Sequence, residues 1–190
     1  MEKIHTVNID DIVLKLPIRS VSPRLDICLF NPFTYNSDTI EALAGKLVQK
    51  LKSIHEDISA VVVPEAKAIT LGYELSKQLD LPLVVLRKTQ KAYMVNESAI
   101  MYKSITSGNS SLILDGADKD FLAGKSVITI DDVHSTGATL QAMNKLLSKF
   151  NITVAKNLSI FTEGNTEHEN LISLGNLPVF EKDAQILKWD

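Results

Sequence analysis

Short, continuously apolar runs alternate with longer segments of helical periodicity, and this alternation constrains the fold more than any other feature. Runs of this kind are typical of strands that are buried on both faces of a sheet. When strands alternate with helices, a parallel, doubly wound α/β sheet is favoured. Strands are expected at residues 59–63, 81–88, 111–116, 126–130 and 154–161.

The helical segments predict the rest of the core. Apolar residues recur at helical spacing in residues 39–54, after Pro64 and in residues 138–150. We therefore predict one α/β domain over residues 1–190, with a mainly parallel five-stranded sheet flanked by helices and a core at about residues 37–164.

Three segments lie outside this alternation. Residues 1–36 and 165–190 are expected to fold together as a small hood over the core. Residues 89–104 have weak periodicity and mixed charge. A long loop within a compact domain is often a lid, so we expect this segment to be a mobile lid. A two-stranded excursion is the alternative.

Charge and cysteine content exclude several classes of protein. The net charge of the 190-residue chain is -3, which argues against nucleic acid as a partner. Cys28 is the one cysteine, so no internal disulfide can form, as suits a reducing compartment. No run approaches the ~18 apolar residues of a membrane span. We expect a cytoplasmic protein without a membrane partner.

One strand is followed by an unusual polar loop. The stretch VITIDDVHSTGATL places Asp131 and Asp132 at the end of a buried strand, before a hydroxyl-rich turn at Gly137. Backbone N–H groups and the helix dipole at such a turn form a phosphate cradle. The two carboxylates can bind a vicinal diol or a hydrated Mg²⁺. Phosphate, diol and metal together describe 5-phosphoribosyl 1-pyrophosphate (PRPP).

A second loop is expected at the same edge of the sheet as the loop after residue 130. The segment PEAKA follows the strand at residues 59–63. In doubly wound sheets, ligands bind beyond the carboxyl ends of the strands. Both loops should therefore open on one edge of the sheet and form one site.

These motifs resemble those of type I phosphoribosyltransferases, most closely the adenine (purine) branch. VITIDDVHSTGATL looks like the family's PRPP signature. VVVPEAKAITLGYELSKQLDLPLVVLRKTQK, residues 61–91, is similar to its pyrophosphate loop and following strand. The resemblance covers residues from about 25 to 165. It implies an enzyme that transfers the phosphoribosyl group of PRPP to a purine, adenine favoured, in purine salvage. Mg²⁺ would be the cofactor, and the protein would be a homodimer.

The resemblance also implies roles for individual residues. Asp131 and Asp132 would be catalytic, binding the ribose hydroxyls and, through water, Mg²⁺. The 5-phosphate would be bound by Val133, His134, Ser135, Thr136, Gly137, Ala138 and Thr139. Pyrophosphate would be bound by Glu65, Ala66, Lys67, Ala68, Arg87, Lys88 and Lys91. The loop of residues 65–68 often contains a strained or cis peptide in the family, and Arg87, Lys88 and Lys91 would lie at a dimer interface. The hood would bind the base.

The chain departs from the family pattern in several places. Lys67 and Ala68 stand where relatives carry Arg and Gly, so the grip on pyrophosphate could differ. His134 replaces an apolar residue, and it is either exposed or close to the 5-phosphate. For the base we predict Phe30, by stacking, and Asn31, whose amide both donates and accepts. Packing of Phe30 under the hood is the alternative, and adenine, guanine and xanthine all stay open.

Two other functions compete with purine transfer. An orotate phosphoribosyltransferase shares the Arg-Lys-x-x-Lys strand end, but here Ala92 and Tyr93 follow, where that branch has His-Gly. A regulator that senses PRPP and binds nucleic acid, with little or no catalysis, is the second. The altered pyrophosphate loop keeps this second alternative open, whereas the net charge and the lack of a helix-turn-helix pattern before the first core strand argue against it.

Overall fold

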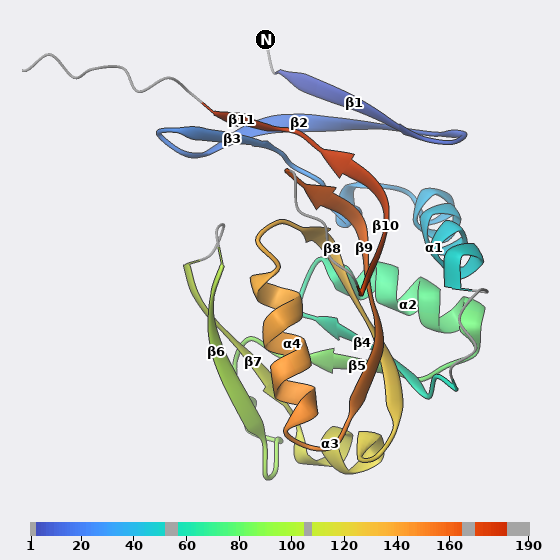
Figure 1. Cartoon of the computed structure of the whole chain (residues 1–190), viewed down its shortest axis with the longest axis vertical. Helices are drawn as coiled ribbons and strands as arrows, with labels where there is room; N and C mark the ends of the chain where they lie inside the picture. The colour runs from blue at the N-terminus through green and yellow to red at the C-terminus, as the bar shows by residue number, and fades with distance from the viewer. Residues whose placement is uncertain (1–2, 52–56, 105–107, 165–169, 182–190) are drawn as a thin grey trace, which may run out of the picture.

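A five-stranded, wholly parallel sheet forms the centre of the fold (Figure 1). The computed structural model describes residues 3–51, 57–104, 108–164 and 170–181. The predicted α/β fold with a five-stranded parallel sheet is confirmed. The strand order is β10-β9-β8-β4-β5, and the strands are β4 (Ala60–Pro64), β5 (Leu83–Leu86), β8 (Ser126–His134), β9 (Thr153–Glu163) and β10 (Leu171–Leu177).

Helices cover both faces of this sheet. Helices α1 (Ser37–Leu51) and α2 (Ala68–Leu79) pack on one face, where alternate residues of β4 and β8 point toward them. Helices α3 (Gly116–Leu122) and α4 (Ala138–Ser148) cover the other face. Because side chains alternate along a strand, each central strand contributes to both cores. The residues of β4 are all fully or almost fully buried.

Close packing of α2 on β4 fixes the loop that joins them. A Cβ at Gly72 would lie 2.3 Å from Val63 Cγ1, so only glycine lets the helix approach the strand this closely. The short connection, residues 65–67, is therefore anchored at both ends by rigid elements.

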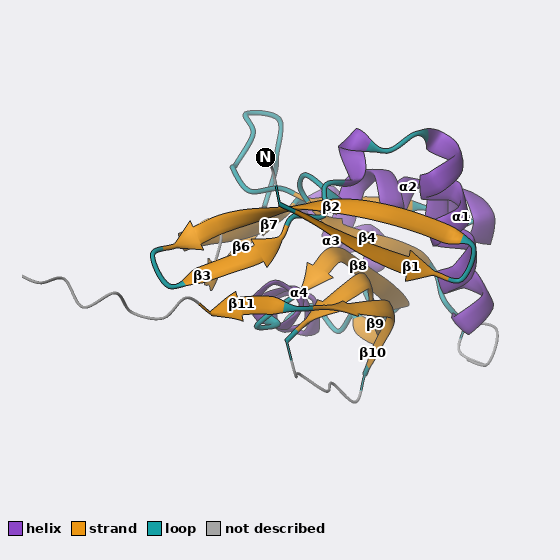
Figure 2. Ribbon diagram, turned by 90° about the horizontal axis from the view of Figure 1, so that it is seen from above, coloured by secondary structure: helices purple, strands orange, loops and turns teal. Residues whose placement is uncertain are grey.

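The hood combines segments from both ends of the described chain (Figure 2). It is an antiparallel sheet of order β1-β2-β3-β11. Leu14 and Leu16 of this sheet are buried in the same core cluster as Leu177 and the α1 residues. The hood thus packs directly on the parallel sheet. Its strands are β1 (Ile4–Ile9), β2 (Ile12–Ser22), β3 (Leu25–Cys28) and β11 (Val179–Glu181), and η1 (Pro32–Thr34) leads from it to α1.

Two sequence predictions about strands are wrong. Residues 111–116 were expected in the parallel sheet, but β7 (Gly108–Leu114) pairs with β6 (Ser98–Ser104) in a separate antiparallel hairpin against α4. The fifth parallel strand is β10, from the part of the chain assigned to the hood. The prediction of a loop at residues 89–104 is also wrong for residues 98–104, which form β6, so the two-stranded alternative is correct there.

No helix among the described residues could cross a membrane.

Candidate functional site

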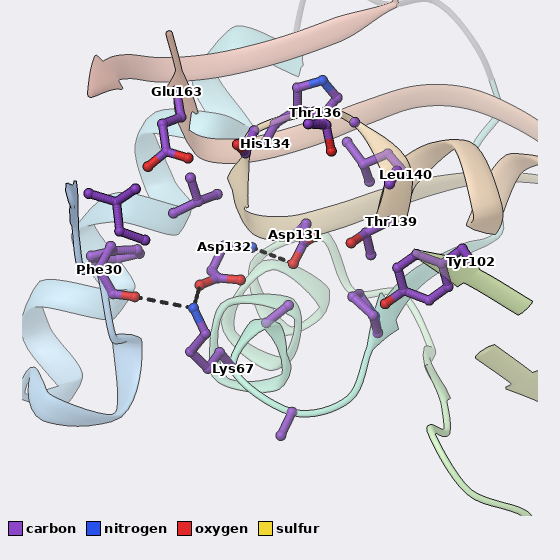
Figure 3. Close-up of a pocket in the computed structure, with 18 of the residues that line it drawn as sticks. Phe30, Lys67, Tyr102, Asp131, Asp132, His134, Thr136, Thr139, Leu140 and Glu163 are labelled. Carbon is purple, nitrogen blue, oxygen red and sulfur yellow. Dashed lines mark hydrogen bonds and ion pairs between the residues drawn. The ribbon is translucent and has the colours of Figure 1, made fainter. Parts of the chain in front are cut away.

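The two predicted loops open on one edge of the parallel sheet. From β4 the chain winds outward to β5, whereas from β8 it winds the other way to β9 and β10. Beyond the carboxyl ends of β4 and β8, the direction of winding reverses, and doubly wound folds bind ligands at this point. A cavity of about 230 Å³ lies there, lined by both loops and by the hood residues Ile27 to Phe30 (Figure 3).

The turn after β8 lines the cavity and leads into the N-terminus of α4. Gly137 precedes α4 with φ of 79°, a left-handed conformation that glycine adopts without strain. A Cβ at this position would lie 3.0 Å from the Cε1 atom of His134. His134 is 5% exposed and lines the cavity, so the alternative prediction that this residue is exposed is wrong. The buried imidazole forms the floor on which the turn packs.

The acidic pair at the end of β8 is almost completely buried. Asp131 and Asp132 are 9% and 7% exposed, and Asp132 N donates a hydrogen bond of 2.9 Å to Asp131 Oδ1. Burial, followed by the charge of Asp132, raises the pKa of Asp131 well above its usual value. Two carboxylates confined in this way are stabilised by a nearby cation or by a proton held between them.

Lys67 provides that cation from the opposite loop. Its ammonium forms an ion pair with Asp132 Oδ2 and donates a hydrogen bond of 3.3 Å to the backbone oxygen of Phe30 (Figure 3). The adjoining peptide bond between Glu65 and Ala66 is cis. Lys67 thus links the β4–α2 loop, the end of β8 and the hood across one cavity.

Glu163 lines the cavity, although sequence reasoning missed it. It is the last residue of β9, whose register pairs His134 with Thr162, so Glu163 lies beside Ser135. Glu163 is 7% exposed, and burial raises the pKa of its carboxyl group, while a hydrogen bond with Ser135 opposes the shift. No local signal in the sequence marks this residue.

Tyr102 of β6 is a second lining residue that the sequence did not indicate. Its ring points toward the cavity near Thr139 (Figure 3). It reaches this place because the hairpin packs on α4.

The other predicted residues divide into two groups. Those that line the cavity are Phe30, Glu65, Ala66, Lys67, Ala68, Lys88, Asp131, Asp132, Val133, His134, Ser135, Thr136, Gly137, Ala138 and Thr139. Arg87, Lys91 and Asn31 do not line it. Arg87 Nε lies 3.0 Å from Glu65 Oε2, and Lys91 Nζ donates to Thr89 Oγ1.

The residues predicted for the base require correction. The side chain of Asn31 accepts a hydrogen bond from Phe33 N and thereby caps η1. Phe30 is 1% exposed, and its ring packs edge-on against Phe161 with 5.2 Å between centroids. The ring is therefore packed as a core side chain, as the alternative expected, although Phe30 also lines the cavity.

Several known proteins are similar to this chain in fold or in sequence. Adenine phosphoribosyltransferase from Saccharomyces cerevisiae has the same fold, with a TM-score of 0.66, 17% identity and coverage of 90% of this chain and 93% of that one. Hypoxanthine/guanine phosphoribosyltransferase from Methanothermococcus okinawensis is 28% identical over 134 residues, 70% of this chain and 68% of that protein. The purine biosynthesis transcriptional repressor PurR of Bacillus subtilis is 29% identical over 151 residues, 75% of this chain and 51% of the repressor.

The chain spans about half to two thirds of the length of the curated relatives it matches. The pattern of the phosphoribosyl transferase domain matches residues 35–172, which contain the parallel sheet up to the start of β10 and both loops of the cavity. The resemblance seen in the sequence is confirmed, and the chain belongs to the phosphoribosyl transferase domain family.

Proposed function

We propose that this protein transfers the 5-phosphoribosyl group of PRPP to a purine base and releases pyrophosphate. The observation that carries the proposal is the ion pair between Lys67 and Asp132, which joins the two loops over one cavity. A sugar bound by one loop would present its diphosphate to the other. Relatives named for transfer to adenine and to hypoxanthine or guanine support a purine acceptor.

Each part of PRPP has a complementary part of the cavity. The turn at residues 133–139 would receive the 5-phosphate on its backbone N–H groups. Asp131 and Asp132 would accept hydrogen bonds from the ribose hydroxyls. Lys67 and Lys88 would neutralise the departing diphosphate, because charge develops there as the glycosidic bond breaks. The connection at residues 89–97, together with the β6–β7 hairpin that follows it, would exclude water as a lid.

The acidic pair also fits Mg²⁺, which prefers oxygen ligands and keeps several waters. The described residues contain no group of three or more side chains of the usual metal-binding types. Asp131 and Asp132 would therefore hold the ion through water, together with oxygens of the substrate. When bound, Mg²⁺ supplies positive charge against the diphosphate.

Several finer features of the proposal rest on the sequence resemblance. Adenine is the favoured acceptor, and two copies form a homodimer with Arg87, Lys88 and Lys91 at the interface. A location in the cytoplasm is proposed separately, from the single cysteine of the chain. Light scattering at micromolar concentration tests the dimer, which requires twice the mass of 21.0 kDa.

A substrate panel tests the activity. The protein is mixed with PRPP, Mg²⁺ and each of adenine, guanine, hypoxanthine, xanthine, orotate and uracil, and pyrophosphate release is measured. We expect release with a purine and its loss in Asp132→Asn. Asp118→Asn, on α3 and outside the cavity, is the matched control. If Asp132→Asn still releases pyrophosphate at the wild-type rate, Asp132 does not have the proposed role.

A PRPP-sensing regulator is the second candidate, and the similarity to the repressor PurR favours it. It predicts PRPP binding without pyrophosphate release. An electrophoretic shift assay with fragments of genomic DNA, with and without PRPP, distinguishes the two: an enzyme leaves the mobility of DNA unchanged.

A further inference from the structure

Glu163 is a buried carboxyl group held rigidly at the edge of the cavity. Within the parallel sheet, it pairs in register with Leu177 of β10. The next residue, Gly164, donates a hydrogen bond of 3.2 Å from its backbone N to Leu177 O. Glu163 is 7% exposed, and its environment is fixed by two strands and by the Ser135 side chain. A polar group so constrained can select among ligands.

The end of the cavity around Glu163 differs from the rest. Ile27, Cys28 and Leu29 of the hood line the cavity, and Cys28 lies close enough to Glu163 for the charge of that carboxyl group to raise the pKa of its thiol, after the larger effect of burial. The carboxyl group of Glu163 lies on the side of Phe30, whereas Tyr102 and Thr139 lie at the opposite end (Figure 3). The hood end is therefore an apolar wall with one carboxyl group. Such a wall suits a flat heteroaromatic ring that carries a hydrogen-bond donor.

The chemistry of a carboxyl group restricts which base edges it can contact. In its ionised form it only accepts hydrogen bonds, and in its protonated form it keeps an acceptor oxygen. An exocyclic amine, as in adenine and guanine, is a donor that either form can bind. A carbonyl oxygen at the same position cannot form a hydrogen bond with an ionised carboxylate, because both groups are acceptors.

We propose that Glu163 accepts a hydrogen bond from the exocyclic amine of the base and thereby selects aminopurines over hypoxanthine and xanthine. This inference rests on the proposed function, because it identifies the acceptor class for the same cavity. It replaces Phe30 and Asn31 as the residues that distinguish the base.

Binding of nucleotides tests the proposal without turnover. AMP, GMP and IMP are titrated by calorimetry into the wild-type protein, Glu163→Gln and Glu163→Asp. AMP and IMP differ at C6, and GMP and IMP differ by the amine at C2. Hydrogen bonds to charged groups predict that the wild type binds AMP or GMP roughly 10- to 100-fold more tightly than IMP.

The variants should change this preference in different ways. Glutamine can donate to a carbonyl oxygen, so Glu163→Gln should bring IMP to within about threefold of the preferred nucleotide, an effect of less than 1 kcal/mol. Glu163→Asp keeps an acceptor and should retain part of the preference. Glu41→Gln, on α1 and outside the cavity, should match the wild type.

The outcomes separate this inference from the proposed function. A wild type that binds all three nucleotides equally, or a Glu163→Gln variant with the preference intact, overturns the inference even if pyrophosphate is released. Selective binding without pyrophosphate release supports the inference and overturns the enzyme. No binding of any nucleotide overturns both. Thermal unfolding of each variant confirms that it is folded.

Discussion

Replacing Gly137 with alanine tests whether the turn after β8 depends on both its backbone conformation and its packing. Gly137 has φ of 79°, and a Cβ there would lie 3.0 Å from His134 Cε1 and 3.1 Å from His134 Nε2. The left-handed conformation costs a non-glycine residue roughly 1–2 kcal/mol. The contact is also shorter than the ~3.5–4.0 Å optimum for carbon atoms, so the buried imidazole must shift, and overpacking of this kind costs about 1–3 kcal/mol.

Gly124 provides a matched control. Its φ is 72°, and a Cβ there meets nothing within 4 Å. Gly124→Ala should therefore lose only the conformational part, roughly 1–2 kcal/mol, whereas Gly137→Ala should lose about 2–5 kcal/mol in total. For a chain of this length, each kcal/mol lowers Tm by roughly 2–4 °C.

Two measurements check the prediction. Urea unfolding gives the stability difference between the variants, and calorimetry gives their affinity for ribose 5-phosphate. Gly137→Ala should weaken ribose 5-phosphate binding, because displacement of the turn moves the N–H groups that receive the phosphate, while Gly124→Ala should bind as the wild type does. Equal destabilisation in the two variants, or unchanged binding in Gly137→Ala, would refute the argument.

Three further predictions concern packing and charge. Gly72→Ala should destabilise the protein by about 1–3 kcal/mol in urea unfolding, because its Cβ would lie 2.3 Å from Val63 Cγ1. Gly45→Ala should be neutral or stabilising by up to about 1 kcal/mol, since its new Cβ meets only the flexible end of Gln78; equal losses at the two glycines would contradict this. Phe30→Ala should lose about 3–5 kcal/mol as a core residue, and a changed KM for the base with unaltered stability would instead show that the ring stacks on it. Burial, followed by the charge of Asp115, raises the pKa of Asp118. The folded state therefore binds this proton more tightly than the unfolded state, and stability is lost as pH rises from the unfolded value through the folded one. Asp118→Asn should be more stable than the wild type above this pH window and equally stable below it. Thermal unfolding at a series of pH values measures the difference, and a difference that is the same at every pH would contradict a raised pKa of Asp118.

Four of the five parallel strands, β4, β5, β8 and β9, could be predicted from their short apolar runs. Residues 60–64 are apolar and buried, Val127, Ile128 and Ile130 are fully buried, and both segments belong to central strands of the sheet. Leu112 and Leu114 are equally buried, but their strand pairs with β6 in the hairpin and packs against α4 and β5 without joining the parallel sheet. β10 lies at an edge of the sheet and carries mostly half-buried residues, so its sequence lacks the continuous apolar run that marks a central strand.

The site could be predicted where its residues are close in sequence. Asp131, Asp132 and the turn at Gly137 follow one strand, and parallel pairing explains why the β4 loop faces them. Glu163 and Tyr102 reach the cavity through the register of β9 and the packing of the hairpin on α4. Such contacts between distant segments leave no periodic pattern. The burial of His134 likewise depends on how the turn folds back on it.

The single ammonium group of Lys67 makes the hood and the acidic pair dependent on each other. An anion that attracts this group away from Asp132 also removes it from the Phe30 carbonyl, because one side chain serves both partners. An anion bound at the β4–α2 loop would therefore act on two contacts of Lys67 at once, the charge balance of the acidic pair and the attachment of the hood.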